Sequence, residues 1–287
     1  MRDYEDSFEM QHLITNKGVF ATFCVQHTVT GEVWTAKHTR AEPRFVRREA
    51  AILYKVRNEP TLLGFYALYS SPRLSVIVTD FMVGGDLVER FASADFVLNE
   101  SKCKSYIRQI CQGLRHIHAC GIVHLDLKPF SVVFNSYDDD SGLKITDFGS
   151  AQWLPGDGSG GLKVEKMCGS VEFVSPEVIE CTQATTATDC WGVGVIAYML
   201  ITGGRSPFFG GHRFRTMGKI LLAKFEDNMA QSTAHVSQDA MKFIRELLLL
   251  DPQFRMSADE CLRHPWLTNE DETDVLKTLE TSWMKQG

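Results

Sequence analysis

The sequence predicts an α+β fold of two lobes, the first rich in strands and the second largely helical. Up to about Val83, the apolar residues fall in short strand-like stretches with one helix among them. After the pair Gly84-Gly85, they recur at the three- and four-residue spacing that is typical of amphipathic helices. We therefore expect a first lobe over residues 1–83, a hinge and second lobe over 84–268, and a short tail over 269–287.

Composition and charge exclude several classes of protein. The 287 residues are 44% hydrophobic and 23% charged, which is ordinary for a globular protein with a large core. A formal charge of −6, without an obvious basic face, argues against nucleic-acid binding. No apolar run reaches the roughly 18 residues that span a bilayer, and residues 1–10 are too acidic and polar for a signal peptide. We expect no membrane partner, and we expect the eight cysteines, which form no C-x-x-C pair, to be reduced and buried in a cytosolic protein.

The first lobe is predicted to contain a hairpin, a helix and a buried strand. Residues 22–25 and 33–37 flank a turn at Thr30-Gly31, a pattern that is typical of a β-hairpin. The apolar residues between Phe45 and Val56 predict the helix, and the uninterrupted run over 75–79 predicts the buried strand.

The second lobe is predicted to contain four helices. The first follows the apolar residues from Cys103 to Ile117 and ends near Gly121, as at a C-cap glycine. The other three helices are a buried central helix over 190–202, an amphipathic helix over 239–250 and a helix that opens with a capping box at 257–260. Between the first helix and the central one, we expect two short strands over 132–134 and 143–146 and a mobile glycine-rich loop over 155–161.

The loop from His124 to Ser131 is the most informative stretch of the chain. It reads His-Leu-Asp-Leu-Lys-Pro-Phe-Ser, and Asp147-Phe148-Gly149 follows sixteen residues later. These segments resemble the catalytic loop and the metal-binding motif of protein kinases, which read H-R-D-L-x-x-x-N and D-F-G. Leu125 stands here in place of the arginine, and Ser131 in place of the asparagine.

The resemblance to protein kinases extends from about Phe8 to Leu267 and implies the bilobal protein kinase fold. Further matching segments are Ala36-Lys37, Glu49, Ser175-Pro176-Glu177, 189–194, Arg255 and His264-Pro265-Trp266. The stretches 168–177 and 194–203 resemble the kinase domains of the myosin light-chain kinase, titin and obscurin group, and the degenerate catalytic loop is most similar to an obscurin-type domain. This resemblance implies one domain of a longer muscle protein, located in the cytoplasm and specifically in the sarcomere.

The resemblance also implies a role for each matching residue. Asp126 would orient a substrate hydroxyl, and Lys128 would reach the γ-phosphate of ATP. Lys37 would hold the α- and β-phosphates, with Glu49 fixing its direction, and Thr79 would guard the back of the adenine pocket. The candidate cofactor-binding residues are Gly18, Val25, Ala36, Lys37, Glu49, Asp80, Met82 and Asp86, and the candidate metal ligands are Asp147 and the degenerate Ser131. ATP and Mg²⁺ are the implied cofactors of an active domain, and an inactive domain would bind neither.

Three departures from the family pattern weaken the expected chemistry. The Ser131 hydroxyl is shorter than an asparagine carbonyl and is a poorer oxygen donor for a hard cation, although a water could bridge the gap. Leu125 removes the arginine that would receive an activation-loop phosphate. Counting back from Val25, the phosphate-binding pattern G-x-G-x-x-G-x-V retains only its first glycine, and two phenylalanines replace the others.

These two phenylalanines, Phe20 and Phe23, allow two interpretations. One of them folds into the cleft and takes the place of the nucleotide, or the hairpin is only slightly altered and both rings lie on the surface of the lobe. Glycine at these positions would let backbone amides approach a phosphate, which a bulky side chain hinders.

Several matching residues also have a structural interpretation that needs no catalysis. Lys37–Glu49 and Glu177–Arg255 would be ion pairs, Asp86 a helix N-cap, Asp189 an acceptor for backbone near His124, and His124 with Phe148 a packed pair. Phe130 replaces the glutamate that meets a substrate arginine in relatives that select basic substrates.

Two functions are compatible with this sequence. The first is a pseudokinase that serves as a scaffold for other proteins, and the alternative is a weakly active Ser/Thr protein kinase. The tail over 269–287 either packs on the lobe as a helix or binds a partner, and it lacks the basic face of a calmodulin target.

Overall fold

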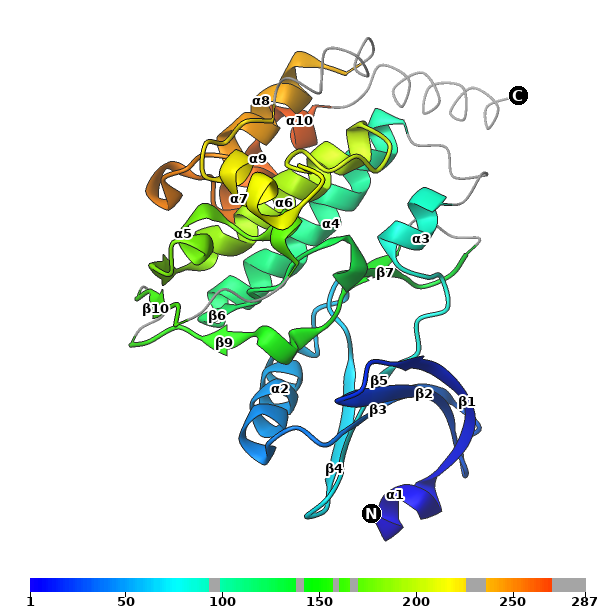
Figure 1. The fold of residues 1–287 in the computed structure, drawn as a ribbon. Coiled ribbons are helices and arrows are strands. Elements are labelled where there is room, and N and C mark those ends of the chain that lie inside the picture. The colour runs from blue at the N-terminus through cyan, green and yellow to red at the C-terminus, as the bar shows by residue number, and fades with distance from the viewer. Residues whose placement is uncertain (93–98, 138–141, 157–159, 166–169, 226–235, 270–287) are drawn as a thin grey trace, which may run out of the picture.

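A computed structural model describes residues 1–92, 99–137, 142–156, 160–165, 170–225 and 236–269. Figure 1 shows two lobes, a twisted sheet with α2 beside it and a larger helical body. The predicted α+β architecture is therefore confirmed. The tail over 270–287 and residues 157–159 of the predicted glycine-rich loop lie outside the described residues.

The first lobe is built on an antiparallel sheet with the strand order β1-β2-β3-β5-β4. Its elements are α1 (Arg2–Ser7), β1 (Phe8–Asn16), β2 (Phe20–His27), β3 (Val33–Thr39), α2 (Pro43–Val56), β4 (Phe65–Ser70) and β5 (Ser75–Asp80). The predicted hairpin is formed by β2 and β3, and Gly31 in its turn has a φ of 74°, a conformation that glycine adopts without steric cost. The predicted helix and buried strand are α2 and β5.

Strand β1 was not predicted, because its sequence carries almost no strand signal. It lies at the edge of the sheet, and after the buried Phe8 its residues are mostly exposed. An edge strand with two solvated faces needs no alternation of apolar and polar residues. Helix α1 precedes it and packs the buried Tyr4 ring against Phe8, with 5.7 Å between ring centroids.

The second lobe is helical and also contains short two-stranded sheets. Its helices are α3 (Leu87–Ala92), α4 (Glu100–Ala119), α5 (Pro176–Ile179), α6 (Thr186–Ile201), α7 (Arg213–Ile220), α8 (Gln238–Leu247), α9 (Ala258–Arg263) and α10 (Pro265–Thr268). Its strands are β6 (Ile122–Val123), β7 (Val132–Phe134), β8 (Leu143–Ile145), β9 (Gln152–Trp153), β10 (Leu162–Lys163) and β11 (Gln183–Ala184). Short 3₁₀ helices are η1 (Pro129–Ser131), η2 (Phe148–Ser150), η3 (Val171–Phe173) and η5 (Pro252–Phe254).

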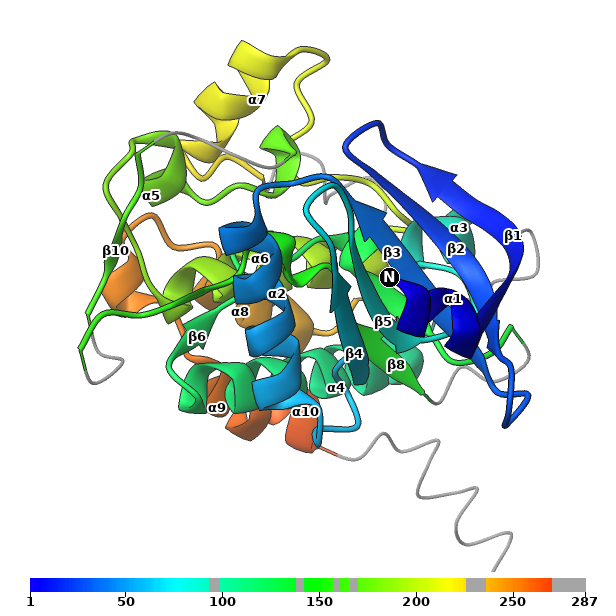
Figure 2. The same ribbon diagram turned by 90° about the horizontal axis from the view of Figure 1, so that it is seen from below.

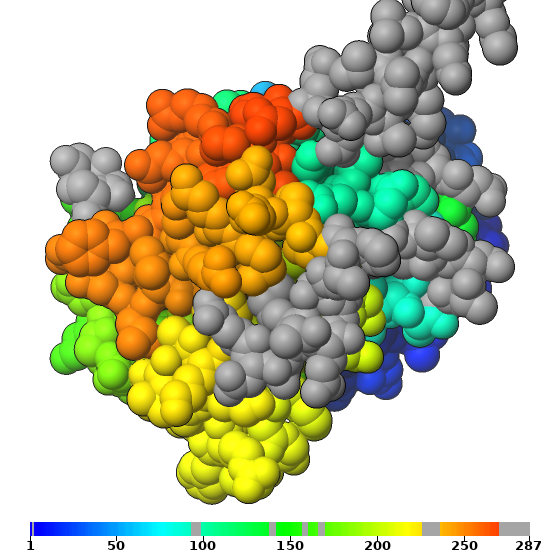
Figure 3. All heavy atoms as spheres, turned by 90° about the horizontal axis from the view of Figure 1, so that it is seen from above, coloured from blue at the N-terminus to red at the C-terminus, as the bar shows by residue number. Residues whose placement is uncertain are grey.

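Helix α6 is the centre of the second lobe, as its apolar sequence predicted. Nearly all its residues are buried, including Trp191 and Tyr198. Seen from above, the C-terminal helices cover the face of the lobe that is far from the sheet, and α7 projects from the body in the view from below (Figures 2 and 3). The predicted capping box is present, since Ser257 Oγ accepts the amide of Glu260 at 3.2 Å.

The expectation of buried thiols holds for most of the cysteines but not for all. The seven cysteines within the described ranges are free and five of them are buried, whereas Cys120 is partly exposed and Cys181 is exposed. In the part of the chain that the structure describes, no helix has the length and apolar character needed to cross a membrane.

Close packing of α6 on α8 yields a testable prediction at Gly194. A Cβ added there would lie 2.8 Å from Leu248 Cδ2 and 2.9 Å from Leu247 Cβ. Overpacking of this kind is expected to lower the free energy of unfolding of Gly194→Ala by about 1–3 kcal/mol, as measured by urea denaturation. The control is Gly218→Ala in α7, where no atom beyond the adjoining residues and the helix's own backbone lies within 4 Å of the added Cβ. We expect that variant to be stabilised by about 0.5–1 kcal/mol, and equal losses in both variants would contradict the packing explanation.

Candidate active site

A cavity of about 280 Å³ lies between the sheet of the first lobe and the strands of the second. It is lined by Ile14, Thr15, Lys17, Phe20, Thr22, Thr35, Lys37, Glu49, Leu53, Leu63, Ile77, Thr79, Asp80, Met82, Val133, Thr146, Asp147 and Phe148. Of the predicted cofactor and metal residues, Lys37, Glu49, Asp80, Met82 and Asp147 line it. The remaining predicted residues are not part of its wall, namely Gly18, Val25, Ala36, Asp86 and Ser131.

An ion pair joins the two elements of the first lobe at this cavity. Lys37 Nζ in β3 lies 2.7 Å from Glu49 Oε1 in α2, and both side chains are largely buried. Asp147 lies close to this pair, because a Cβ added at Gly149 would be 3.7 Å from Asp147 Oδ1, Glu49 Oε2 and Lys37 Nζ alike. Arg48 Nη2 donates to the Gly149 carbonyl at 3.1 Å, which ties α2 to η2. The residues predicted to orient a nucleotide and its metal are therefore brought together.

Val25 and Ala36, which the sequence assigned to the nucleotide site, lie on the other face of the sheet. Both are fully buried in an apolar cluster away from the cavity. Side chains alternate between the faces of a strand, so Ala36 points away from the side on which its neighbour Lys37 lies. Thr22, which pairs with Lys37, and Thr35 line the cavity in their place.

This alternation also corrects the register of the phosphate-binding loop. The roof of the cavity is formed by Thr15, Lys17, Phe20 and Thr22, which have the spacing of G-x-G-x-x-G-x-V. The pattern therefore begins at Thr15, three residues before Gly18, and each of its three glycines is replaced. Gly18 instead forms the β1–β2 turn, with a φ of 76° and its amide donating to Asn16 Oδ1 at 3.2 Å.

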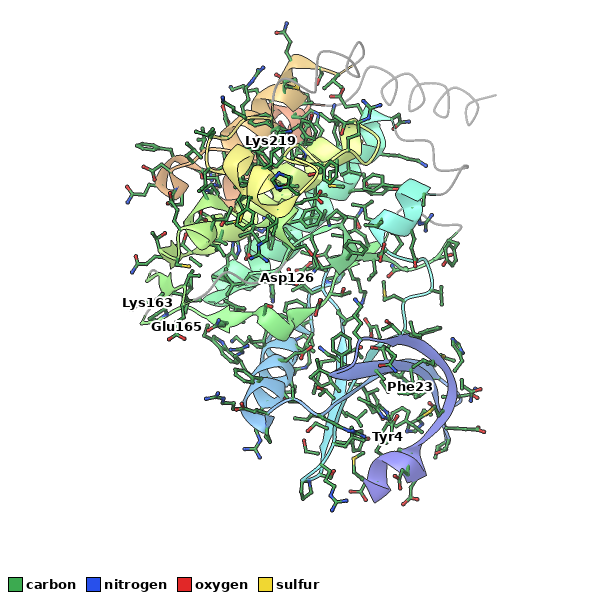
Figure 4. All side chains as sticks on the ribbon, in the orientation of Figure 1. Tyr4, Phe23, Asp126, Lys163, Glu165 and Lys219 are labelled. Carbon is green, nitrogen blue, oxygen red and sulfur yellow. The ribbon has the colours of Figure 1, made fainter. Side chains whose placement is uncertain are left out.

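Phe20 and Phe23 lie on opposite faces of the sheet, so only one of the two rings faces the cavity. Phe20 lines the cavity, and Lys37 Nζ lies 4.9 Å from the centroid of its ring, within the range of a cation–π interaction. Phe23 packs on His38 with 4.8 Å between ring centroids. It lies in the same part of the first lobe as Tyr4, whereas Asp126 lies where the second lobe faces the sheet (Figure 4).

Two carboxylates of the hinge region have structural partners. Asp80 Oδ2 accepts the Gly64 amide at 2.9 Å and pairs with Lys144, which fixes the start of the hinge. Asp86 Oδ1 accepts the amides of Val88 and Glu89, both at 2.9 Å. Burial raises the pKa of the Asp86 carboxyl. The N-cap interpretation of Asp86 therefore agrees with its geometry.

The catalytic loop keeps its carboxylate, but its second metal position is occupied by local hydrogen bonds. Asp126 forms an ion pair with Lys128. The Ser131 hydroxyl accepts the Lys128 amide at 3.0 Å and donates to the Lys128 carbonyl at 2.9 Å. Ser131 is fully buried in these contacts, so its hydroxyl already has a donor and an acceptor on the backbone of the loop. Asp147 keeps the carboxylate of the first metal position, and the hydroxyl at the second position is engaged by the backbone of Lys128.

Asp189 in α6 holds the backbone of the catalytic loop by hydrogen bonds. Asp189 Oδ1 and Oδ2 accept the amides of Leu125 and His124, both at 2.8 Å, and Oδ2 also lies 2.9 Å from His118 Nε2. These bonds hold Leu125 at a φ of 65°, which is sterically unfavourable for a branched side chain. The His124 ring packs on Phe148 with 5.1 Å between centroids.

At the position of the missing arginine, the contacts are apolar. Leu125 packs against a cluster that includes Val174 and Val178, which follow η3 in the second lobe. The Leu125 side chain carries no charge with which to receive a phosphate, and it joins this part of the second lobe by hydrophobic contact.

The fold, the order of the motifs along the chain and the cleft define a protein kinase domain. Residues 18–267 match the protein kinase domain family, and the chain belongs to that family.

Within the family, the chain is similar to muscle kinases. It is 36% identical over 263 residues to smooth muscle myosin light chain kinase of Gallus gallus, which is 90% of this chain and 13% of that protein. The kinase region of C. elegans twitchin superposes with a TM-score of 0.84 at 29% identity, covering 97% of this chain and 50% of that one. The autoinhibited serine kinase domain of the giant muscle protein titin superposes with a TM-score of 0.83 at 26% identity, covering 93% of this chain and 81% of that one.

Proposed function

We propose that this chain is a catalytically impaired kinase domain that serves as a scaffold for other proteins. The observation that carries the proposal is the contact of Phe20 with Lys37, 4.9 Å from ring centroid to Nζ. Lys37 is the residue that would hold the α- and β-phosphates, and the Phe20 ring lies against its ammonium group. Phosphoryl transfer depends on correctly placed phosphates and metal ions. The contact of Phe20 with Lys37 therefore hinders the placement of the phosphates.

The catalytic loop supports the same proposal from the opposite wall of the cleft. The Ser131 hydroxyl is hydrogen-bonded to the backbone of Lys128, which removes a ligand for a second Mg²⁺. Loss of both phosphate placement and metal placement impairs transfer more than either change alone, because the two act on the same transferring group.

Exposed aromatic side chains give a scaffold candidate surfaces. Phe214 in α7 is 79% exposed, Phe209 before it is 59% exposed and Phe254 in η5 is 75% exposed. Aromatic residues are enriched in protein–protein interfaces. The muscle relatives suggest that the scaffold is one part of a longer multidomain protein, in the cytoplasm and specifically in the sarcomere, and an obscurin-type parent stays a prediction.

A weakly active Ser/Thr protein kinase is the second candidate function. The intact pair of Lys37 and Glu49 at 2.7 Å, with Asp147 beside it, favours this alternative. Asp126 also occupies the position of the residue that would orient a substrate hydroxyl. Such a domain would need Phe20 to leave Lys37 before ATP and Mg²⁺ could bind.

A transfer assay separates the two candidates. We expect wild-type protein with ATP and Mg²⁺ or Mn²⁺ to label itself and a general protein substrate no faster than Asp126→Ala does, because phosphates and second metal are both misplaced. The measurement is incorporation of labelled γ-phosphate over hours. Labelling by the wild type that disappears in Asp126→Ala would overturn the scaffold proposal in favour of the weak kinase.

A further inference from the structure

Helix α7 projects from the second lobe and presents an apolar face to solvent (Figure 2). Thr216 and Ile220 are buried, and they hold the opposite side of the helix on the body of the lobe. Phe214 is 79% exposed, and Leu222 in the turn after the helix is 60% exposed. With Gly218 between them, they follow the four-residue spacing that places side chains on one helical face.

Gly218 leaves a notch between these two apolar side chains. It is exposed, and a Cβ added there would meet no atom within 4 Å beyond the adjoining residues and the helix's own backbone. Glycine is less favourable than alanine inside a helix, and no packing contact with the described residues requires it at this position. Because the distance between two packed helices depends on the side chains at their contact, the notch fits the close approach of a second helix.

The loop before α7 is fixed to the helix by hydrogen bonds. Lys219 Nζ donates to the Phe209 carbonyl at 2.8 Å, and the Gly210 amide donates to Thr216 Oγ1 at 3.1 Å. A preorganised surface loses less conformational freedom when a partner binds. We define the α7 surface by its exposed apolar residues, the notch and the adjoining cations, namely Phe209, Phe214, Arg215, Gly218, Lys219 and Leu222.

The α7 surface is basic, although the chain has a formal charge of −6. From residue 190 to residue 225, the sequence contains five lysine and arginine residues and no aspartate or glutamate. Among the residues that the structure describes, no carboxylate oxygen lies within 4.0 Å of the side-chain nitrogens of Arg215, Lys219 or Lys224. The neighbouring η3 carries Glu172, a single carboxylate that does not balance these cations. The charge of the surface is therefore complementary to an acidic partner.

Aromatic and basic side chains together would also suit an anionic membrane, but two observations favour a protein helix. A bilayer has no ridge of side chains to fill the notch at Gly218. The overall charge of −6 also opposes adhesion of the whole domain to an anionic surface.

We infer that the α7 surface binds an acidic amphipathic helix of a separate protein. The apolar residues of that helix would pack between Phe214 and Leu222 over Gly218, as in other complexes where a helix docks through anchors one turn apart. Its carboxylates would face Arg215 and Lys219. This inference rests on the proposed function, because it names the class of partner that the scaffold would hold.

Fluorescence anisotropy with the whole chain and a labelled synthetic peptide tests the inference. The peptide has about 16 residues, enough for a helix, with leucines at positions i, i+3, i+4 and i+7 and glutamates on the other face. We expect the wild type to bind it at least about 10-fold more tightly than the same peptide with lysine in place of glutamate. Added NaCl should weaken the binding, because salt screens exposed charges.

Variants of the α7 surface locate the binding site. Phe214→Ala and Arg215→Glu should each weaken the binding at least about 10-fold, because an aromatic anchor and a facing charge are lost. Gly218→Leu fills the notch with a residue that favours a helix, and should weaken the binding to a similar degree. The matched control is Phe254→Ala, which removes an equally exposed phenylalanine from η5 and should change the affinity less than about 2-fold.

Several outcomes would overturn the inference. These are no binding of the peptide at about 1 mM, equal losses in Phe214→Ala and Phe254→Ala, or tighter binding of the lysine peptide. Sedimentation of the wild type with phosphatidylserine vesicles, without peptide binding, would assign the surface to a membrane instead. The segment over 270–287 is itself acidic, so a gain in peptide affinity after Leu279 and Trp283 are replaced with alanine would identify that segment as the occupant in place of a separate protein.

Failure of this inference and failure of the proposed function give different results. Absence of peptide binding in a chain that transfers no phosphate would overturn the assigned partner and leave the scaffold proposal standing. Phosphate transfer that depends on Asp126 would overturn the scaffold proposal, whether or not the peptide binds to α7.

Discussion

Replacing Glu177 with alanine is expected to lower the free energy of unfolding by about 3–5 kcal/mol. Arg255 Nη1 donates to Glu177 Oε1 at 2.9 Å and Nη2 donates to Oε2 at 3.1 Å, and both residues are buried. The variant leaves the guanidinium inside the second lobe without its carboxylate, although Ala187 and Leu249 still offer carbonyls. An uncompensated buried charge of this kind costs more than the ion pair itself contributes.

Urea denaturation of Glu177→Ala measures this cost, and Asp259→Ala provides the control. Asp259 pairs with Arg263 at 2.7 Å, but both side chains are more than half exposed. Solvent screens such pairs, so the control should lose less than about 1 kcal/mol. If Glu177→Ala also lost less than about 1 kcal/mol of its free energy of unfolding, Arg255 would have found other partners or reached water.

The same pair predicts a pH dependence. Burial raises the pKa of the Glu177 carboxyl, but the hydrogen bonds and charge of Arg255 outweigh burial, so the pKa lies below its ordinary value of 4.5. A lowered pKa in the folded state stabilises the protein above the unfolded pKa, and this contribution is lost as the pH falls through the folded pKa. The difference between wild type and Glu177→Ala should therefore be constant above about pH 5 and shrink in stronger acid.

Elements with a strong burial pattern were predictable from the sequence, and elements without one were not. Helix α6 is apolar on every side and lies at the core, and the β2–β3 hairpin has strand residues on either side of a glycine turn. Strand β1 and the packing of Tyr4 were missed, because an exposed edge strand carries no alternation for periodicity to detect. The ordered motifs predicted the fold more reliably than any local pattern did.

The candidate site was predictable in its motifs but not in its register. Lys37 and Glu49 were correctly expected to pair, because their roles follow from the motif order. The prediction that the phosphate-binding pattern ends at Val25 was wrong. Val25 pairs with Trp34, whose neighbour Thr35 faces the cavity, so Val25 lies on the opposite face of the sheet. The hydrogen bonds of the Ser131 hydroxyl depend on the exact turn at η1, which no sequence pattern specifies.

Phe20→Gly combined with Ser131→Asn is expected to raise the rate of phosphoryl transfer at least about 100-fold above the wild-type background, on the scale of a restored charge-stabilising contact. Glycine uncovers Lys37, and an asparagine carbonyl reaches one bond further than the hydroxyl toward a metal beside Asp147. Each single variant should gain less, because phosphate and metal placement act together.

Phe23→Gly with Ser131→Asn is the control and should gain no more than Ser131→Asn does, since Phe23 faces away from the cavity. Equal gains from the two double variants would show that altered strand stability, and not the ring above Lys37, limits transfer. No gain in a folded Phe20→Gly, Ser131→Asn variant would place the block elsewhere, with Thr15 and Lys17 at the other two glycine positions as the next residues to replace.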